Sequence, residues 1–347
     1  MVYLDNAATT VCKFPASVYD DIWGNANTSY KFGLDARQMA DECRERVKKC
    51  LGVKDGKVIF CSNASEAAKI LLDRFYVENF KTYCWLYEHD SVYDNVETHG
   101  YSKTTHHSNR TAIFQQWVNP VTGTIFDIPS IRQAIGNDCF LCMDATAGIG
   151  KRLLSQSIVN SVDAIWFSGH KFNGPKTGGI LWVSDRLSKA LYLSDDSRNE
   201  YGLKHGTLDV PSFIATTCAL EYTLGNDIEN IWHYAGLNDY LSNRVGNRVV
   251  GFKQLEQYAN DQLNATVLID TGCNADVLVQ YLSSKSIYVG LAHSACSADA
   301  DYRVTQAFGI SKETAERCIR VSFSEDNTFE DIDALVDGIK EFKEKFV

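Results

Sequence analysis

A lysine in a glycine-rich segment is the first residue whose surroundings suggest chemistry. Lys171 lies in SGHKFNGPKTGG (168–179), which follows one apolar run and precedes another. The glycines would let the backbone approach a ligand closely. A lysine in a partly desolvated site favours the neutral amine, a nucleophile that can form a Schiff base with an aldehyde cofactor. The alternative is a solvated loop lysine, and this segment alone does not decide between the two.

An aspartate ends an earlier apolar run. Asp144 follows CFLCM, at the place where a parallel sheet presents its ligand-binding edge. An acid there could pair with a pyridinium nitrogen and keep the ring protonated, so that the ring withdraws electrons, as pyridoxal phosphate chemistry requires. The alternative is an aspartate that caps the next helix.

A third segment could bind an anion. Ser62 to Glu66 comes directly after the apolar run KVIFC and directly before a helical pattern. Backbone N–H groups and the Ser65 hydroxyl would form a site for a phosphate there. The segment could also be a simple helix cap with Glu66 in the first turn, and both interpretations can hold together.

The elements that must position these residues follow from hydrophobic patterning. Short apolar runs rich in β-branched and aromatic residues predict buried strands at 57–61, 82–87, 111–117, 138–144, 163–168 and 178–183. Helical patterns at 36–51 and 65–76 lie before and after the first run, so strands and helices alternate. This alternation predicts an α/β fold with a mainly parallel sheet covered on both faces.

The pattern changes in the second half of the chain. Helical stretches dominate from Pro211 to about Gln257, and TVLID (266–270) then begins a short strand-helix-strand unit that ends near residue 323. Residues 329–346 repeat apolar positions at helical spacing, with acids early and lysines late, as the helix dipole favours. We therefore expect a second, smaller α/β domain closed by an amphipathic helix.

Composition excludes several classes of protein. The chain has 347 residues, 45% hydrophobic and 22% charged, which is the balance of a globular protein rather than a disordered one. A net charge of −10 disfavours direct nucleic-acid binding. The start of the chain has no secretory signal pattern, and no run approaches the ~18 apolar residues of a membrane span. Eleven cysteines at irregular spacing predict reduced thiols, with neither a disulfide framework nor a metal site. We expect a soluble, cytoplasmic protein.

Ten blocks of the sequence, taken in order, resemble the cysteine desulfurases, a class V aminotransferase-like branch of the fold-type I pyridoxal phosphate enzymes. The likeness runs nearly end to end and includes YLDNAATT, GNANTSYKFG, FCSNASEA, EHDSV, VNPVTGTI, MDATAGIGK, SGHKFNGPKTGG, GLKHGTLDVP, HSACSADAD and AFGISKETAERCIRVSF. The resemblance implies a large cofactor-binding domain of residues 12–235. It also implies a small domain of residues 1–11 and 236–347, which carries a catalytic cysteine loop of the long type and a substrate arginine.

The resemblance also implies roles around the cofactor. Lys171 would carry pyridoxal 5'-phosphate, Asp144 would hold the ring nitrogen, and His89 would stack on the ring and help to move protons. Asn119 would lie near the phenolic oxygen. The implied phosphate contacts are Ala64, Ser65, Ser168, His170 and Thr207, the last reaching across a homodimer interface to the partner's site.

Two residues would handle the substrate. Arg320 is similar to the arginine that binds the substrate carboxylate, for which a planar fork of donors is suited; the alternative is an exposed salt bridge. Cys296, flanked by small and polar residues, would accept sulfur from L-cysteine, leaving L-alanine and an enzyme persulfide. The alternative for any one cysteine is a small buried hydrophobe.

The chain departs from the family pattern at a few positions. Ala147 replaces the usual Gln that donates to the phenolic oxygen, and alanine cannot make that bond. Lys204 and His205 stand where Arg and Ser are more common. His293 replaces a Gly just before SAC, where an imidazole could lower the pKa of the Cys296 thiol or could simply be solvated.

The function that the sequence predicts is a homodimeric L-cysteine desulfurase that passes sulfur to a protein acceptor. One alternative is another pyridoxal phosphate enzyme of the same fold, such as an aminotransferase or a selenocysteine lyase. A further alternative is a catalytically silent interaction partner. The sequence names no acceptor, so iron–sulfur assembly, tRNA thiolation and sulfur modification of DNA stay open.

Overall fold

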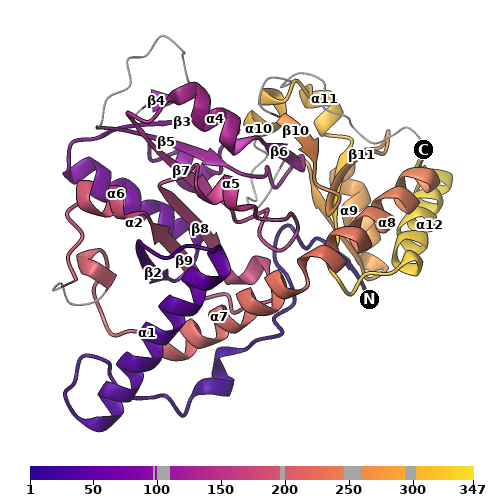
Figure 1. Ribbon diagram of the computed structural model, residues 1–347. Helices are drawn as coiled ribbons and strands as arrows, with labels where there is room; N and C mark the ends of the chain where they lie inside the picture. Colours follow the sequence, from indigo (N-terminus) through magenta and orange to yellow (C-terminus); the bar gives the residue numbers. More distant parts are fainter. Residues whose placement is uncertain (97, 100–109, 196–199, 246–258, 294–301) are drawn as a thin grey trace. The chain divides into compact units, whose positions relative to one another are not determined.

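A computed structural model describes residues 1–96, 98–99, 110–195, 200–245, 259–293 and 302–347 (Figure 1). Contacts divide the chain into two compact units. The large unit comprises Val11–Trp117 and Asp127–Asn226, and the small unit comprises Met1–Thr10, Val118–Phe126 and Asp227–Val347. The sequence pattern gave no sign that 118–126 would group with the C-terminal part of the chain.

A seven-stranded sheet forms the centre of the large unit. Its strand order is β2-β9-β8-β7-β5-β3-β4, and the run from β8 to β4 is parallel, whereas β9 is antiparallel to both of its neighbours. The expected mainly parallel sheet is therefore confirmed. The strands are β2 (Lys57–Cys61), β3 (Lys81–Cys84), β4 (Thr98–His99), β5 (Thr111–Gln116), β7 (Phe140–Asp144), β8 (Ala164–Ser168) and β9 (Gly179–Val183).

Helices cover both faces of this sheet. On one face, α2 (Ala64–Val77) contributes Leu71 and Phe75 to a buried cluster with strand residues such as Phe114. On the other face, Phe213 of α7 (Val210–Gly225) stacks on Phe60 of β2, with ring centroids 4.1 Å apart. α1 (Lys31–Leu51) packs beside α7 (Figure 1).

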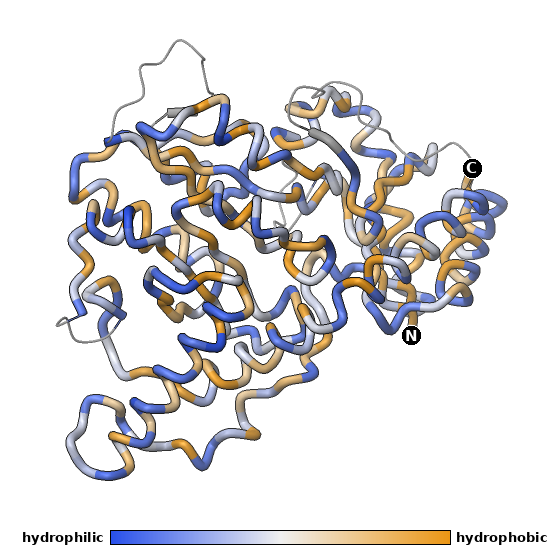
Figure 2. Tube along the Cα trace, viewed as in Figure 1, coloured by the Kyte–Doolittle hydropathy of each residue, from blue (hydrophilic) through white to orange (hydrophobic). Residues whose placement is uncertain are grey.

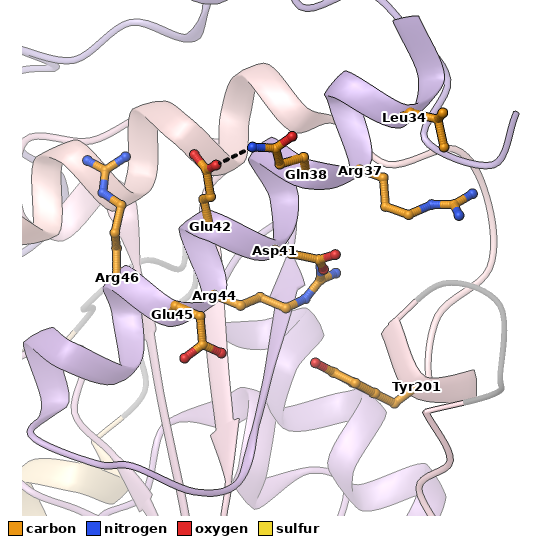
Figure 3. A pocket seen from close by; sticks show the side chains of 9 residues that line it. All are labelled: Leu34, Arg37, Gln38, Asp41, Glu42, Arg44, Glu45, Arg46 and Tyr201. Atoms are coloured by element: carbon orange, nitrogen blue, oxygen red, sulfur yellow. Dashed lines mark hydrogen bonds and ion pairs between the residues drawn. The ribbon is translucent and has the colours of Figure 1, made fainter. Parts of the chain in front are cut away.

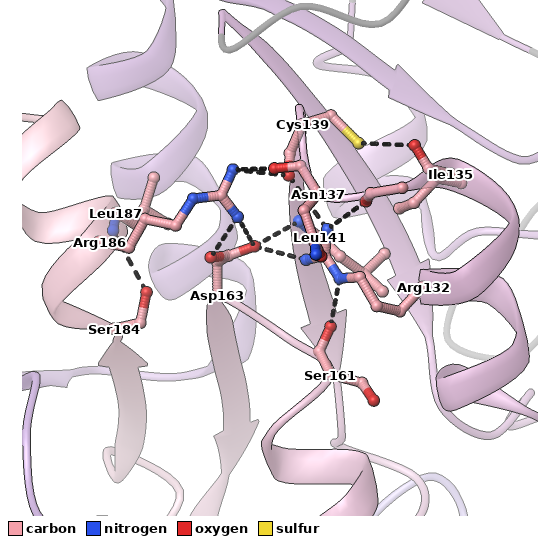
Figure 4. A network of polar contacts seen from close by, with 11 residues as sticks. Arg132, Ile135, Asn137, Cys139, Leu141, Ser161, Asp163, Ser184, Arg186 and Leu187 are labelled. Carbon is pink, nitrogen blue, oxygen red and sulfur yellow. Dashed lines mark hydrogen bonds and ion pairs between the residues drawn. The ribbon is translucent and has the colours of Figure 1, made fainter.

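The shorter elements of the large unit connect these layers. They are α3 (Asp90–Tyr93), α4 (Ile128–Ile135), α5 (Gln156–Val159), α6 (Asp185–Ala190) and the 3₁₀ turns Ala16–Tyr19, Gly169–Lys171 and Glu200–Gly202. Asp163, directly before β8, accepts hydrogen bonds from Arg132, Arg186 and the Leu141 N–H (Figure 4). These bonds tie the amino ends of β7 and β8 to α4 and α6. Ion pairs therefore stabilise the amino edge of the sheet, whereas Asp144 lies at the opposite, carboxyl edge.

The small unit is built on a four-stranded sheet. Its order is β1-β12-β13-β11, in which β1 (Val2–Leu4) is parallel to β12 (Ile287–Leu291). β13 (Cys318–Ser322) is antiparallel to both β12 and β11 (Thr266–Asp270). A separate antiparallel pair joins β6 (Thr124–Phe126) and β10 (Ala259–Gln262).

Five helices lie among the described residues of the small unit. They are α8 (Asp227–Val245), α9 (Ala275–Ser284), α10 (Arg303–Ala307), α11 (Lys312–Ala315) and α12 (Phe329–Phe346). The expected C-terminal helix is confirmed, and Thr328 and Asp331 close its N-terminus as a capping box. Hydrophobic and hydrophilic residues alternate along α12 as its amphipathic pattern requires (Figure 2). None of the described helices combines the length and apolar character needed to cross a membrane.

Candidate functional site

Strand register brings three predicted segments of the large unit to one edge of the sheet. Gly179 of β9 pairs with Ser168 on one side and with Cys61 on the other, so the segments that follow β8 and β2 start in the same row. Asp144 ends β7 and pairs with Trp166 of β8. The parallel strands therefore deliver Asp144, the 168–171 turn and the start of α2 to a common carboxyl edge, where ligands bind in open α/β sheets.

The turn Gly169–Lys171 follows β8 directly and places Lys171 in a half-buried position. Burial, together with the positive charges of Lys171, Lys176 and Lys151, lowers the pKa of the neighbouring His170 to about 4. The imidazole is therefore neutral at pH 7 and offers one donor and one acceptor. A group of lysines around a neutral histidine is a favourable environment for an anion.

Two glycines allow the segment after β8 to pack closely. A Cβ built on Gly179 would lie 2.7 Å from backbone atoms of Asn63, and one built on Gly178 would lie 2.0 Å from Thr216 Oγ1. Neither position has room for a side chain. The start of β9 thus packs directly against the residues that lead into α2.

The start of α2 is a capped helix terminus. The Asn63 side chain accepts the Glu66 N–H at 2.9 Å, and the carboxylate of Glu66 accepts the Ser62 N–H and hydroxyl. Burial tends to raise the pKa of Glu66, but the hydrogen bonds from Ser62 and the ammonium of Lys204 hold it below its usual value. Ala64 is half-buried and Ser65 is exposed in the first turn. The predicted helix cap is therefore present. The N-terminus of α2 can in addition attract a phosphate, because its first N–H groups point out of the helix.

Asp144 is nearly buried, and its side chain is held by the backbone that follows it. Its Oδ1 accepts the Thr146 N–H at 2.8 Å, and its carbonyl oxygen accepts the Trp117 N–H. Oδ2 receives no hydrogen bond from the described residues. Ala147 follows in a half-buried position. The carboxylate is therefore oriented but retains an oxygen for a cofactor.

The donor set at this edge fits pyridoxal phosphate. The buried hydroxyls of Ser168 and Thr146 have no hydrogen-bond partner among the described residues, although buried polar atoms are normally bonded. Lys171 supplies an amine, neutral His170 and the Ser168 hydroxyl supply phosphate contacts, and Asp144 supplies an acid for a ring nitrogen. An orphaned hydroxyl next to a cationic group is what a phosphate would satisfy.

His89 follows β3 and forms the N-cap of α3. Its Nδ1 accepts the Ser91 N–H at 3.2 Å and lies 2.9 Å from the Ser91 hydroxyl. In the neutral ring the proton is therefore on Nε2, which makes that nitrogen a donor. His89 is half-buried, whereas Thr207 is exposed in the segment before α7.

The other predicted residues belong to the small unit. Asn119 is fully buried, and its Oδ1 accepts the N–H groups of Val121 and Thr122 and the Thr122 hydroxyl. The side-chain oxygen of Asn119 thus stabilises a turn. Arg320 is 1% exposed and forms an ion pair with Asp5, so the alternative of a salt bridge is right about the pairing but wrong about its exposure. Cys296 lies outside the described residues.

Sequence reasoning missed two residues of this edge. Thr146 and Lys151 both follow Asp144 in DATAGIGK, and Lys151 is buried close enough to act on His170. The signal for Thr146 was its place two residues after the acid at a strand end. No pattern in the sequence indicated that a lysine twenty residues before Lys171 would be buried near the same histidine.

His170 should make stability depend on pH. Its folded pKa of about 4 lies below its usual 6.5, so protonation favours the unfolded chain. In protein freed of cofactor, we expect the free energy of unfolding in urea to fall as pH drops from 6.5 towards 4, and His170→Gln to reduce this fall. The exposed His205→Gln is the matched control. An unchanged pH profile in His170→Gln would refute this prediction.

Comparisons with known proteins identify the family of the chain. The aminotransferase class-V family model matches residues 2–83 and 92–335. The chain is 28% identical to the "Cysteine desulfurase IscS" of Buchnera aphidicola subsp. Schizaphis graminum (strain Sg), with 97% of this chain and 91% of that protein covered. It is 26% identical to the "Putative cysteine desulfurase NifS" of Bacillus subtilis (strain 168), with 97% and 93% covered.

Solved structures share the fold. A "NifS-like protein" superposes with a TM-score of 0.84 at 24% identity, covering 99% of this chain and 100% of that one. The apo structure of a cysteine desulfurase from Thermococcus onnurineus NA1 has a TM-score of 0.77 at 16% identity, with 99% and 95% covered. Since the family model matches far more than half of the residues, the chain belongs to the aminotransferase class-V family.

Proposed function

We propose that this chain is a pyridoxal phosphate-dependent L-cysteine desulfurase. The observation that carries the proposal is the set of groups at the carboxyl edge of the large sheet. Lys171, neutral His170, the orphaned Ser168 hydroxyl and Asp144 lie there together, with a donor set suited to this cofactor. Relatives that are named cysteine desulfurases align with almost the whole chain and support the choice among the reactions of the family.

When bound, pyridoxal phosphate supplies an electron sink for the carbon next to the amino group. The chain's own residues would prepare that carbon. Asp144 would keep a positive charge on the ring nitrogen, and Ser168 and His170 would bind the phosphate. The Lys171 amine, within reach of the same edge, would take up and return the α-proton as a general base and acid.

Sulfur transfer would use residues of the small unit. Arg320 would bind the substrate carboxylate. The Cys296 thiolate would attack the sulfur of L-cysteine, so that an S–S bond forms and the Cβ–S bond breaks. The electron pair would stay with the carbon skeleton, which takes up a proton to give L-alanine. The products balance as L-alanine and a Cys296 persulfide.

The quaternary state and the location are part of the same proposal. The exposed position of Thr207 supports a homodimer in which this hydroxyl contributes to the partner's phosphate site. A protein acceptor would then receive the persulfide sulfur. We propose the cytoplasm as the location, because its reducing environment keeps a nucleophilic thiol available.

Mass analysis after brief exposure to L-cysteine tests this function. We expect one added sulfur atom at Cys296, with one alanine formed for each persulfide. Cys296→Ser should acquire no sulfur, whereas Cys12→Ser, which removes an exposed cysteine of the large unit, should behave as the parent. Alanine formation at the parent rate by Cys296→Ser would refute the thiol's role. Amino transfer that depends on a keto acid would instead identify an aminotransferase.

A further inference from the structure

Arg320 does not stand alone in the small unit. It lies in the middle of β13, and its Nη2 donates to Oδ1 of Asp5 at 2.8 Å. Its Nη1 donates a long hydrogen bond to the carbonyl oxygen of Pro120 at 3.4 Å, and its buried Nε has no partner among the described residues. The guanidinium is therefore held firmly at one nitrogen and retains donor capacity at the others.

The backbone of Asp5 is itself fixed. Asp5 follows β1 and forms a bridge to Ser322 of β13, and its carbonyl oxygen accepts the Ala8 N–H at 3.0 Å. Its side chain is 22% exposed, against 1% for Arg320. Asp5 thus supplies a rigidly placed counter-charge to a guanidinium that would be costly to bury alone.

A glycine makes room for this ion pair. Gly290 of β12 is the register partner of Arg320. A Cβ built on Gly290 would lie 2.7 Å from Asp5 Oδ1, 2.9 Å from Arg320 Nη2 and 3.0 Å from Arg320 Nε. The carboxylate and the guanidinium therefore lie directly on the Gly290 backbone, and any side chain there would displace them.

We propose that Asp5 is a positioning residue that makes Arg320 selective for the substrate's α-carboxylate. This inference rests on the proposed function, in which Arg320 binds that carboxylate. Asp5 engages Nη2 and so fixes the plane of the guanidinium, which leaves Nη1 to bind the substrate. Asp5 also neutralises the charge of Arg320 when no substrate is present, so the guanidinium attracts other anions less strongly. The Gly290 backbone lies against both side chains and leaves room for them because it carries no side chain.

A comparison of L-cysteine with its methyl ester tests the inference. The ester keeps the thiol and the amine but lacks the anionic carboxylate. The measured quantity is the ratio of kcat/KM for the two substrates at one pH, so that differences in amine chemistry cancel between variants. The parent should prefer L-cysteine, and Asp5→Asn should lower this preference about tenfold, the size expected for a lost charge-assisted interaction.

The control is a second aspartate–arginine pair on the same sheet. Asp270 of β11 accepts hydrogen bonds from Arg317 at 2.8 and 3.1 Å. Asp270→Asn should leave the substrate preference unchanged. Gly290→Ala provides a second route, because it retains both charged residues but must displace them, and it should lower the preference as Asp5→Asn does. Thermal unfolding of each variant verifies that it folds. If Asp5→Asn does not fold, the substrate preference of Gly290→Ala decides the test.

The outcomes separate this inference from the function on which it rests. If Asp5→Asn and Gly290→Ala slow both substrates equally, or slow neither, Asp5 has no part in selectivity and the inference is wrong while the proposed function stands. If the parent forms neither L-alanine from L-cysteine nor L-alanine methyl ester from the ester, the proposed function fails, and the inference fails with it.

Discussion

Replacement of Lys171 by alanine is expected to lower the rate of alanine formation from L-cysteine by at least roughly 10²- to 10⁴-fold. This is the range for losing a positioned proton-transfer group, and loss of covalent attachment of the cofactor adds to it. The reason lies in the structure of the edge. Lys171 is the half-buried amine in the turn after β8, three residues beyond Ser168, and no other residue of that turn carries an amine.

The rate is measured as alanine produced, with visible absorbance after gel filtration as an independent readout of cofactor retention. Lys176→Ala is the matched control, because Lys176 is exposed and also contributes positive charge near His170. It should retain turnover within a few-fold. If Lys171→Ala and Lys176→Ala lose similar activity, the effect comes from net charge and not from the amine at 171.

The central sheet was predictable because its strands are buried on both faces. Runs such as KVIFC and GILWV need no alternation, so a continuous apolar stretch marks the strand directly, and β2 and β9 occupy those residues. The predicted end of β3 was less accurate. The expected strand at 82–87 ends at Cys84, and Trp85 and Tyr87 form a turn in which their rings stack 5.9 Å apart. Aromatic residues that pack in a turn look the same in sequence as those in a strand.

Elements that depend on distant partners were not predictable. β1 has only three residues, too few for any periodicity, and it exists because Val2 to Leu4 pair with Ile287 to Val289. The antiparallel direction of β9 likewise follows from a short connection after β8. The same limit applies to the site. Strand ends placed Asp144, Ser168 and Lys171 at one edge, but nothing in the spacing shows that Asp5 lies on Arg320.

Loss of the buried ion pair between Glu200 and Arg44 is expected to have the largest effect on stability. Glu200 is fully buried, and its carboxylate accepts Arg44 Nη2 at 2.7 Å and the N–H of Phe60 in edge strand β2 at 2.9 Å. Burial raises the pKa of Glu200 above its usual value, although Arg44 and the Phe60 N–H both favour the carboxylate. Figure 3 shows Arg44 on α1 beside Asp41 and the Tyr201 ring.

This pair holds a strained part of the chain. Glu200 and Tyr201 have φ values of +44° and +57°, in the left-handed region that non-glycine residues rarely adopt. The segment then continues to Lys204, which pairs with Glu66 at 3.0 Å, and to Thr207. If Glu200 is lost, the strain is no longer offset, and Lys204 and Thr207 lose the anchor that precedes them.

Glu200→Ala is therefore expected to lower the free energy of unfolding by about 3–5 kcal/mol, because it leaves a buried guanidinium and a strand N–H without their acceptor. The matched control is Glu221→Ala. Glu221 pairs with Arg46, also on α1, but those two side chains are 38% and 33% exposed, so we expect a loss below about 1 kcal/mol. Urea unfolding at fixed protein concentration measures both.

A double variant distinguishes an unpaired charge from lost packing. Arg44→Met combined with Glu200→Leu removes both charges and keeps apolar volume, so it should be more stable than Glu200→Ala alone. If the double variant is as unstable as the single one, the cost lies in the Phe60 N–H and the left-handed turn rather than in the stranded guanidinium. If Glu200→Ala costs no more than Glu221→Ala, burial of the pair contributes nothing, and the 200–207 segment must be held by Lys204 and Glu66 instead.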